Sequence, residues 1–189
     1  MELLNEVKVR MLLLEELNKI YGECPDTRII NELGLDFGAS RIDVAVVNGI
    51  IHGYEIKSDL DTLLRLPRQM EYYNKAFERM TIVASRKYLV NIKELVPDWW
   101  GIKIISSDQS RLITIRKGRK VSQQDPTLII KLLWKKELEG LIDHLGLPKS
   151  LKKMRKNQLL ALLNEEADFN VIRSYVYKTL KTRQNWRLN

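Results

Sequence analysis

Three ionisable residues lie at strand spacing in a stretch of sequence that is otherwise apolar. Asp43 precedes the dipeptide Asn48-Gly49, and Glu55 and Lys57 follow it. Asn-Gly between two Val- and Ile-rich segments is a strong β-hairpin signal. Side chains two residues apart on a strand point from the same face. The pattern predicts a hairpin with an acid on one strand and Glu-x-Lys on the next.

Two carboxylates and a lysine on one face of a sheet suit the hydrolysis of a phosphodiester. Asp43 and Glu55 are the oxygen ligands that Mg²⁺ or Mn²⁺ prefers, and the Ile56 carbonyl offers a further oxygen. Lys57 can orient an attacking water, lower its pKa or neutralise developing charge. The alternative is a structural ion pair between Asp43 and Lys57. Because buried charges are costly without a function, we expect a metal-dependent DNA nuclease that uses a metal-activated water.

The register of the hairpin decides whether the two acids share a face. A two-residue Asn-Gly turn would place Asp43 opposite Tyr54 and send Glu55 to the other side of the sheet. A three-residue loop with Gly49 in the left-handed conformation places both acids on one face, as does a bulge near Gly53. We therefore expect one of these two irregular geometries.

The elements around the hairpin predict an α/β fold, a mixed sheet flanked by helices. Strands are expected at residues 41–47, 50–58, 80–84, 101–106 and 111–116, and residues 27–35 fit either a strand or a helical turn. Helices are expected at residues 2–21, 59–77, 88–95, 127–145, 155–166 and 169–182. The first helix has an apolar stripe of Leu3, Val7, Met11, Leu14, Leu17 and Tyr21. Pro67 marks a kink or the true first turn of the second helix.

Composition indicates a soluble globular protein of 189 residues, with 44% apolar and 30% charged residues. No apolar run approaches the ~20 residues of a membrane span. A secretory signal begins with a positively charged segment, whereas this chain has Glu2 and Glu6 before its leucines. The single cysteine, Cys24, fits a reducing compartment. We expect a cytoplasmic protein with no membrane partner.

The net charge of +8 is unevenly distributed. Residues 1–115 hold 15 Lys and Arg against 17 Asp and Glu, whereas residues 116–189 hold 17 against 7. This asymmetry predicts an acidic catalytic core at residues 1–117 and a basic helical region at residues 125–189 that meets DNA. The alternative is a set of solvated lysine-rich helix faces.

Over residues 1–116 the motifs resemble those of the PD-(D/E)XK nuclease superfamily, particularly its small stand-alone prokaryotic members. The chain has Arg41-Ile42-Asp43, which lacks the usual preceding proline, then Glu55-Ile56-Lys57, and then Gln69-x-x-x-Tyr73 as in the RecB-like branch. The resemblance implies a restriction-endonuclease-like fold in which Asp43 and Glu55 bind Mg²⁺ or Mn²⁺ and Lys57 is the catalytic lysine.

By the same resemblance, Gln69 and Tyr73 support the site or contact DNA, although ordinary helix packing is the alternative. A further acid is expected, with Glu32 as first choice and Glu16 as second. Another Glu-x-Lys, at Glu6, is expected to be surface decoration.

Basic residues outside the motifs are candidates for contacts with DNA phosphates. Arg41 and Arg65 lie near the motifs. The others lie between two amphipathic helices and are Lys149, Lys152, Lys153, Arg155 and Lys156. These helices distantly resemble a SAP-type helix-turn-helix module, although Pro148 stands in the connection. The alternative is a helical cap or a dimerisation element.

Two other functions stay open on the sequence. One is a non-catalytic nucleic-acid-binding protein on a nuclease fold, since a fold does not prove activity. The other is a nuclease subunit of a larger repair, restriction or mobile-element system. A homodimer or a larger nucleic-acid-processing complex is compatible with either.

Overall fold

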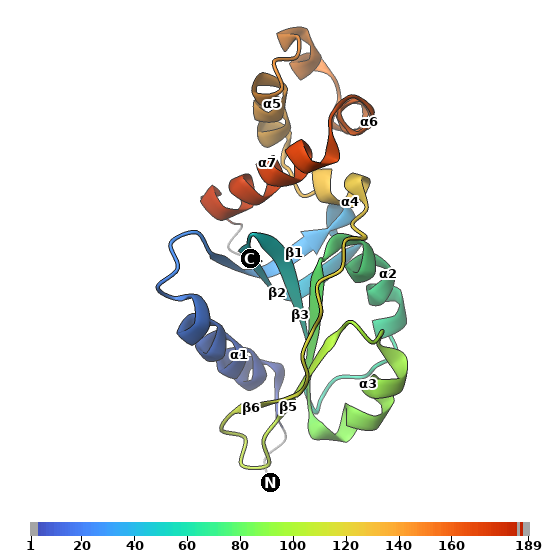
Figure 1. Ribbon diagram of the computed structural model, residues 1–189. Coiled ribbons are helices and arrows are strands. Elements are labelled where there is room, and N and C mark those ends of the chain that lie inside the picture. The colour runs from blue at the N-terminus through green and yellow to red at the C-terminus, as the bar shows by residue number, and fades with distance from the viewer. Residues whose placement is uncertain (1–3, 185, 187–189) are drawn as a thin grey trace.

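The computed structural model describes residues 4–184 and 186 and contains a six-stranded mixed sheet with helices on both faces (Figure 1). The strands, in spatial order, are β1 (Arg28–Leu35), β2 (Ser40–Asn48), β3 (Ile50–Lys57), β4 (Arg79–Ala84), β5 (Gly101–Ile105) and β6 (Leu112–Arg116). The pairs β3–β4 and β4–β5 are parallel, and the other three are antiparallel. The predicted fold class is confirmed, and residues 27–35 belong to a strand.

Helix α1 (Glu6–Tyr21) covers one face of the sheet. The residues of α1 that are buried are Val9, Leu13 and Leu17. The predicted stripe is confirmed at Leu17 but wrong at Val7 and Met11, which are 66% and 65% exposed. Leu3 lies outside the described residues. The helix carries two apolar stripes, and packing against β2 and β3 selects the second one.

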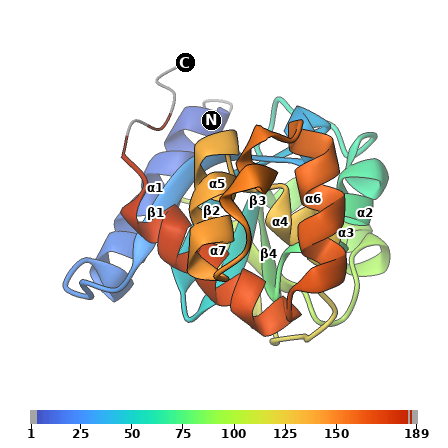
Figure 2. The same cartoon turned by 90° about the horizontal axis from the view of Figure 1, so that it is seen from above.

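The opposite face is covered by α2 (Leu66–Ala76) and α3 (Leu89–Leu95). Pro67 lies in the first turn of α2, so it begins the helix and does not kink it. A helical region stands at one end of this face (Figure 1; Figure 2). It consists of α4 (Pro126–Ile130), α5 (Lys135–His144), a short turn (Lys149–Lys153), α6 (Lys156–Glu166) and α7 (Phe169–Thr182). One hydrophobic core runs from the sheet into these helices.

The single helix expected at residues 127–145 is wrong, because the chain breaks it into α4 and α5. Leu132 and Leu133 donate to carbonyls only three residues back, which tightens and ends α4. Trp134 is extended (ψ 164°), and its N–H donates to the Glu137 carboxylate at 2.6 Å. Glu137, the third residue of α5, therefore caps the start of α5 as a helix separate from α4.

The β2–β3 hairpin turns at Gly49, which has the expected left-handed conformation (φ 64°). Its register differs from the expected loop, because Val46 pairs with His52 and not with Ile50. The observed pairing is shifted by two residues from the expected one. Because side chains alternate along a strand, a shift of two leaves every side chain on the expected face. In the described part of the chain, no helix is long and apolar enough to cross a membrane.

Candidate functional site

A cavity of about 570 Å³ opens where the start of α1, the β1–β2 connection, the end of β3 and the start of α2 meet. Of the residues expected to do chemistry, the following line it: Glu32, Arg41, Asp43, Glu55, Ile56, Lys57, Arg65 and Gln69. Segments separated by some 40 residues thus contribute to one concave site.

Local irregularities in three strands open this cavity. Glu32 and Asp43 lie opposite each other between regular pairs of β1 and β2, and Glu32 has a left-handed backbone (φ 56°). The β2–β3 pairing ends at Val44 and Tyr54. Beyond that point the Ile56 N–H donates to the Asp43 carboxylate at 2.7 Å. A side chain thus replaces a backbone acceptor, and β2 and β3 separate around Asp43.

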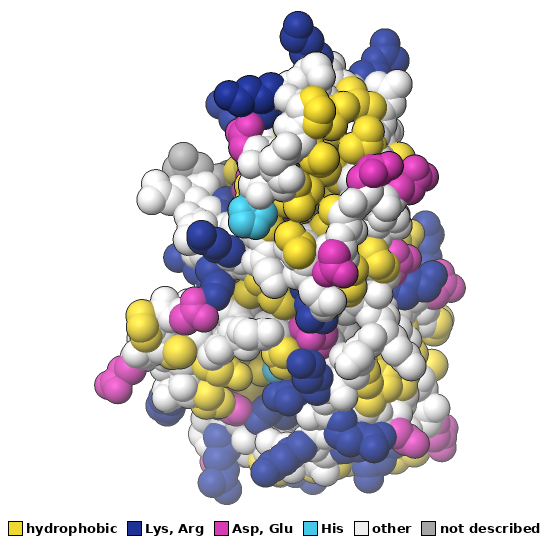
Figure 3. All heavy atoms as spheres, turned by 45° about the horizontal axis from the view of Figure 1, so that its top comes forward, with side chains coloured by type: hydrophobic (Ala, Val, Ile, Leu, Met, Phe, Trp, Pro, Cys, Tyr) yellow, Lys and Arg dark blue, Asp and Glu magenta, His cyan; other side chains and the backbone are white. Residues whose placement is uncertain are grey.

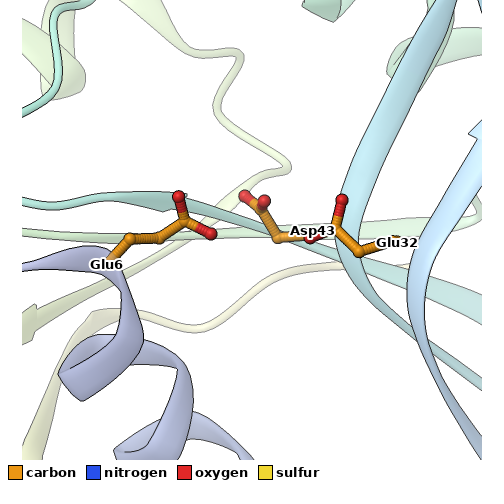
Figure 4. A group of neighbouring side chains, drawn as sticks. All are labelled: Glu6, Glu32 and Asp43. Carbon is orange, nitrogen blue, oxygen red and sulfur yellow. The ribbon is translucent and has the colours of Figure 1, made fainter. Parts of the chain in front are cut away.

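Three carboxylates converge on one arginine in the cavity. Oxygens of Glu6, Glu32 and Asp43 lie within 4.8 Å of one another, and the side chains point together from α1, β1 and β2 (Figure 4). Arg10 Nη2 lies 2.5 Å from Glu6, 2.6 Å from Glu32 and 3.1 Å from Asp43. Arg10 Nη1 also donates to the Asp43 carbonyl at 2.7 Å. One guanidinium therefore offsets part of the negative charge of three carboxylates, whose oxygen donors suit a hard cation.

Glu55 is held by a separate network on the α2 side. Lys57 Nζ lies 2.7 Å from Glu55 Oε1, and the Gln69 amide donates to the same oxygen at 2.9 Å. The Tyr73 hydroxyl lies 2.8 Å from Glu55 Oε2 and 2.7 Å from the Arg41 carbonyl. Tyr73 is buried behind Glu55 and does not line the cavity. Its contacts orient the carboxylate and tie α2 to β2.

The electrostatics of the cavity favour an added positive charge. Burial, together with the neighbouring Glu55 carboxylate, raises the pKa of Asp43 to about 7. The Ile56 N–H and Arg10 act against this shift without cancelling it. A divalent cation would offset the repulsion, and Glu6, Glu32 and Asp43 bring carboxylate oxygens within 4.8 Å of one another for it, whereas the Glu55 oxygens accept from Lys57, Gln69 and Tyr73. The residues present therefore fit a magnesium or manganese ion.

The rim of the cavity is basic. Arg41 pairs with Glu32 at 2.7 Å. Arg65 and Arg68 are exposed, and within the described residues neither side chain has a hydrogen bond or ion pair. Two guanidinium groups near buried carboxylates can hold an anion while a cation bridges it to the acids.

Sequence reasoning missed charged residues of the cavity, among them Glu6 and Arg68, and also Arg10, which contacts the carboxylates. Glu6 was interpreted as surface decoration, although it lines the cavity. Arg68 was not singled out; its signal was its position three residues after Arg65, on the same helical face. The second-choice acid, Glu16, pairs with Lys103 at 2.6 Å and does not line the cavity.

The basic residues of the helical region lie apart from the cavity. Lys152 pairs with Asp143 at 2.6 Å, whereas Lys149, Lys153 and Arg155 form no ion pair in the described part of the chain. Figure 3 shows Lys and Arg side chains at the outer end of this region and in groups farther down the same face, with hydrophobic side chains between them. Of the predicted DNA-contacting residues in this region, Lys156 reaches toward the β1–β2 connection, where it contacts Phe37, as does Lys131 at the end of α4.

Comparison with known proteins gives one similar solved structure and one curated relative. A protein of unknown function from Silicibacter pomeroyi, SPO1766, aligns with a TM-score of 0.42 and 19% identity over 69% of this chain and 87% of its own. That likeness supports no conclusion about function. Protein cII of Enterobacteria phage P4 is 34% identical over 184 residues, which cover 96% of this chain and 69% of the relative.

The family model described as bacteriophage P4 protein cII matches residues 1–187. Neither this family nor the phage relative is described as a nuclease. The metal-dependent DNA nuclease expected from the hairpin is therefore wrong. Asp43, Glu55 and Lys57 do lie together, as predicted. Acids and a lysine also cluster in proteins that bind a ligand and catalyse no reaction. On the family match and the 34% identity, the chain belongs to the bacteriophage P4 protein cII family.

Proposed function

We propose that the protein is a non-catalytic DNA-binding protein that holds a backbone phosphate in its cavity through a divalent cation. Glu6, Glu32 and Asp43 would hold Mg²⁺ or Mn²⁺, and the bound ion would supply positive charge beside the phosphate. The guanidinium groups of Arg65 and Arg68 would hold the phosphate oxygens.

One observation carries this proposal: Asp43, whose pKa is raised, lines the same cavity as Arg65 and Arg68, two arginines that form no ion pair with any described residue. A site of that kind has room for an anion and for the cation that joins it to the acids. The basic helical region adds charge that would follow the DNA backbone without reading its sequence. The resemblance of the motif residues to metal-binding ones supports the choice of ion.

Fluorescence anisotropy with a labelled oligonucleotide tests this function. We expect binding that is stronger in Mg²⁺ or Mn²⁺ than in EDTA, and Asp43→Asn should abolish the metal dependence. The double variant Arg65→Ala/Arg68→Ala should lower the slope of log affinity against log salt by about 2, because two phosphate contacts are lost. Arg86→Ala removes an exposed arginine outside the cavity and should leave the slope unchanged.

The DNA should be recovered at its original length on a denaturing gel after incubation with metal. Shortened DNA would show turnover and would contradict a binding-only protein. Absence of DNA binding in every buffer would overturn the proposal, and so would equal binding by the wild type and the double-arginine variant.

A further inference from the structure

The connection between β1 and β2 holds an aromatic side chain in a conformation that costs free energy. Asp36, Phe37 and Gly38 are successive residues in the left-handed region, with φ of 46°, 57° and 92°. Such a backbone is strained for Phe, at roughly 1–3 kcal/mol. Burial of the ring offsets little of this cost, because Phe37 is 58% exposed. The turn therefore presents a ring to solvent at the expense of stability.

Two lysines from the helical region flank this ring. Lys156 Nζ, in the first residue of α6, lies 4.7 Å from the ring centroid, and Lys131 Nζ, at the end of α4, lies 5.5 Å from it. Lys131 also pairs with Asp36 at 2.6 Å. An exposed ring with ammonium groups beside it is the combination that binds single-stranded nucleic acid, in which bases stack on rings and phosphates meet lysines.

The ring adjoins the cavity. The residues directly after Phe37, from Gly38 to Arg41, line the cavity wall. A DNA strand with one phosphate in the cavity would therefore pass the ring within a short distance. In a regular duplex the bases are stacked on one another, so only an unpaired base offers its face to Phe37.

We propose that Phe37 stacks on an unpaired base of a DNA strand whose phosphates contact Lys131 and Lys156. This inference rests on the proposed DNA-binding function and deepens it, because it assigns a preference for single-stranded DNA or for a gap or end over a continuous duplex. The strain at the turn is then the cost of keeping the ring in place before DNA arrives.

Anisotropy with a single-stranded oligonucleotide and with the matching duplex tests this inference. Phe37→Ala should weaken single-strand binding by about 5- to 150-fold, the range expected for one stacked base, and leave duplex binding unchanged. Phe37→Trp should restore the affinity. Quenching of 2-aminopurine in the oligonucleotide should disappear in Phe37→Ala and return in Phe37→Trp. Val90→Ala, which alters a 67% exposed side chain on α3, should match the wild type.

The outcomes separate this inference from the proposed function. If the wild type binds both DNAs and Phe37→Ala binds them equally well, stacking is wrong and DNA binding stands. If the wild type binds neither DNA, the proposed function fails as well. If Phe37→Ala instead lowers the mass measured by light scattering, Phe37 contacts a second copy of the chain, and stacking is overturned. A melting temperature equal to or above that of the wild type excludes unfolding as the cause of lost binding.

Discussion

Asp43 is the residue on which the charge balance of the cavity depends. It accepts a hydrogen bond from Ile56, contacts Arg10, and lies close enough to Glu55 for repulsion to help raise its pKa to about 7. In the unfolded chain the same carboxyl ionises near pH 3.8. Between these two values the folded protein binds more protons than the unfolded one, so its free energy of unfolding falls as the pH rises.

Asp43→Asn removes this pH dependence. In EDTA we expect the variant to gain stability relative to the wild type as the pH rises from 4 to 8, up to about 4 kcal/mol for a shift of about 3 units. Thermal unfolding at several pH values measures it. Asp59→Asn is the control with the opposite sign, because its hydrogen bond with Ser85 lowers the Asp59 pKa. A constant difference between Asp43→Asn and the wild type would contradict the assignment.

Strand β1 is irregular at the position where it supplies a side chain to the cavity. Glu32 adopts φ 56° within a strand, which turns its carboxylate toward Arg10 and Arg41. Both ion pairs are partly exposed and stabilise the fold little. The left-handed backbone is therefore a local cost that serves the geometry of the site.

Glu32→Gly should be more stable than Glu32→Ala by about 1 kcal/mol, since only glycine adopts this backbone without strain. Both variants lose the carboxylate, so their difference reports the backbone alone. Asn31 is regularly paired with Val44. At that position the order should reverse, and the Ala variant should be more stable than the Gly variant. Urea denaturation provides the comparison. An Ala variant at position 32 as stable as the Gly variant would show that the strand is not strained there.

The whole molecule is joined by a buried carboxylate between the sheet and the helical region. Glu78, which is 2% exposed, accepts from the Ile51 N–H at 3.1 Å and from the Tyr177 hydroxyl at 2.8 Å. Lys120, from the segment between β6 and α4, lies 3.5 Å away. These contacts and the continuous core make the helices on residues 126–182 part of the same packed body as the sheet.

Tyr177→Phe should destabilise the entire protein by about 1.5–3 kcal/mol, because it removes a donor to a buried charge. Tyr175→Phe, two residues away, removes a donor to the neutral Glu137 carbonyl and should cost only about 0.5–1.5 kcal/mol. In both variants circular dichroism and tryptophan fluorescence should show coincident urea transitions. Two separate transitions would mean that the helical region unfolds independently.

The sequence by itself determined the strands, the hairpin at Gly49 and the grouping of Asp43, Glu55 and Lys57. These features follow from local rules: alternation along a strand, turn chemistry, and the spacing of side chains on one face. The same motif also predicted nuclease chemistry, and family membership overturned that prediction. The residue types in a site show which groups it can bind, and they do not show whether it catalyses a reaction.

Tertiary structure alone decided which stripe of α1 is buried, where the helix at residues 127–145 breaks, and which charges share the cavity. Glu6, Arg10 and Arg68 are distant from the hairpin in sequence, and each is unremarkable on its own helix. They come to the same site as Asp43 only because the sheet orders β1, β2 and β3 side by side and packs α1 and α2 beside these strands. Long-range packing of this kind has no periodic signal along the chain, so the composition of the cavity could not be read before the fold was known.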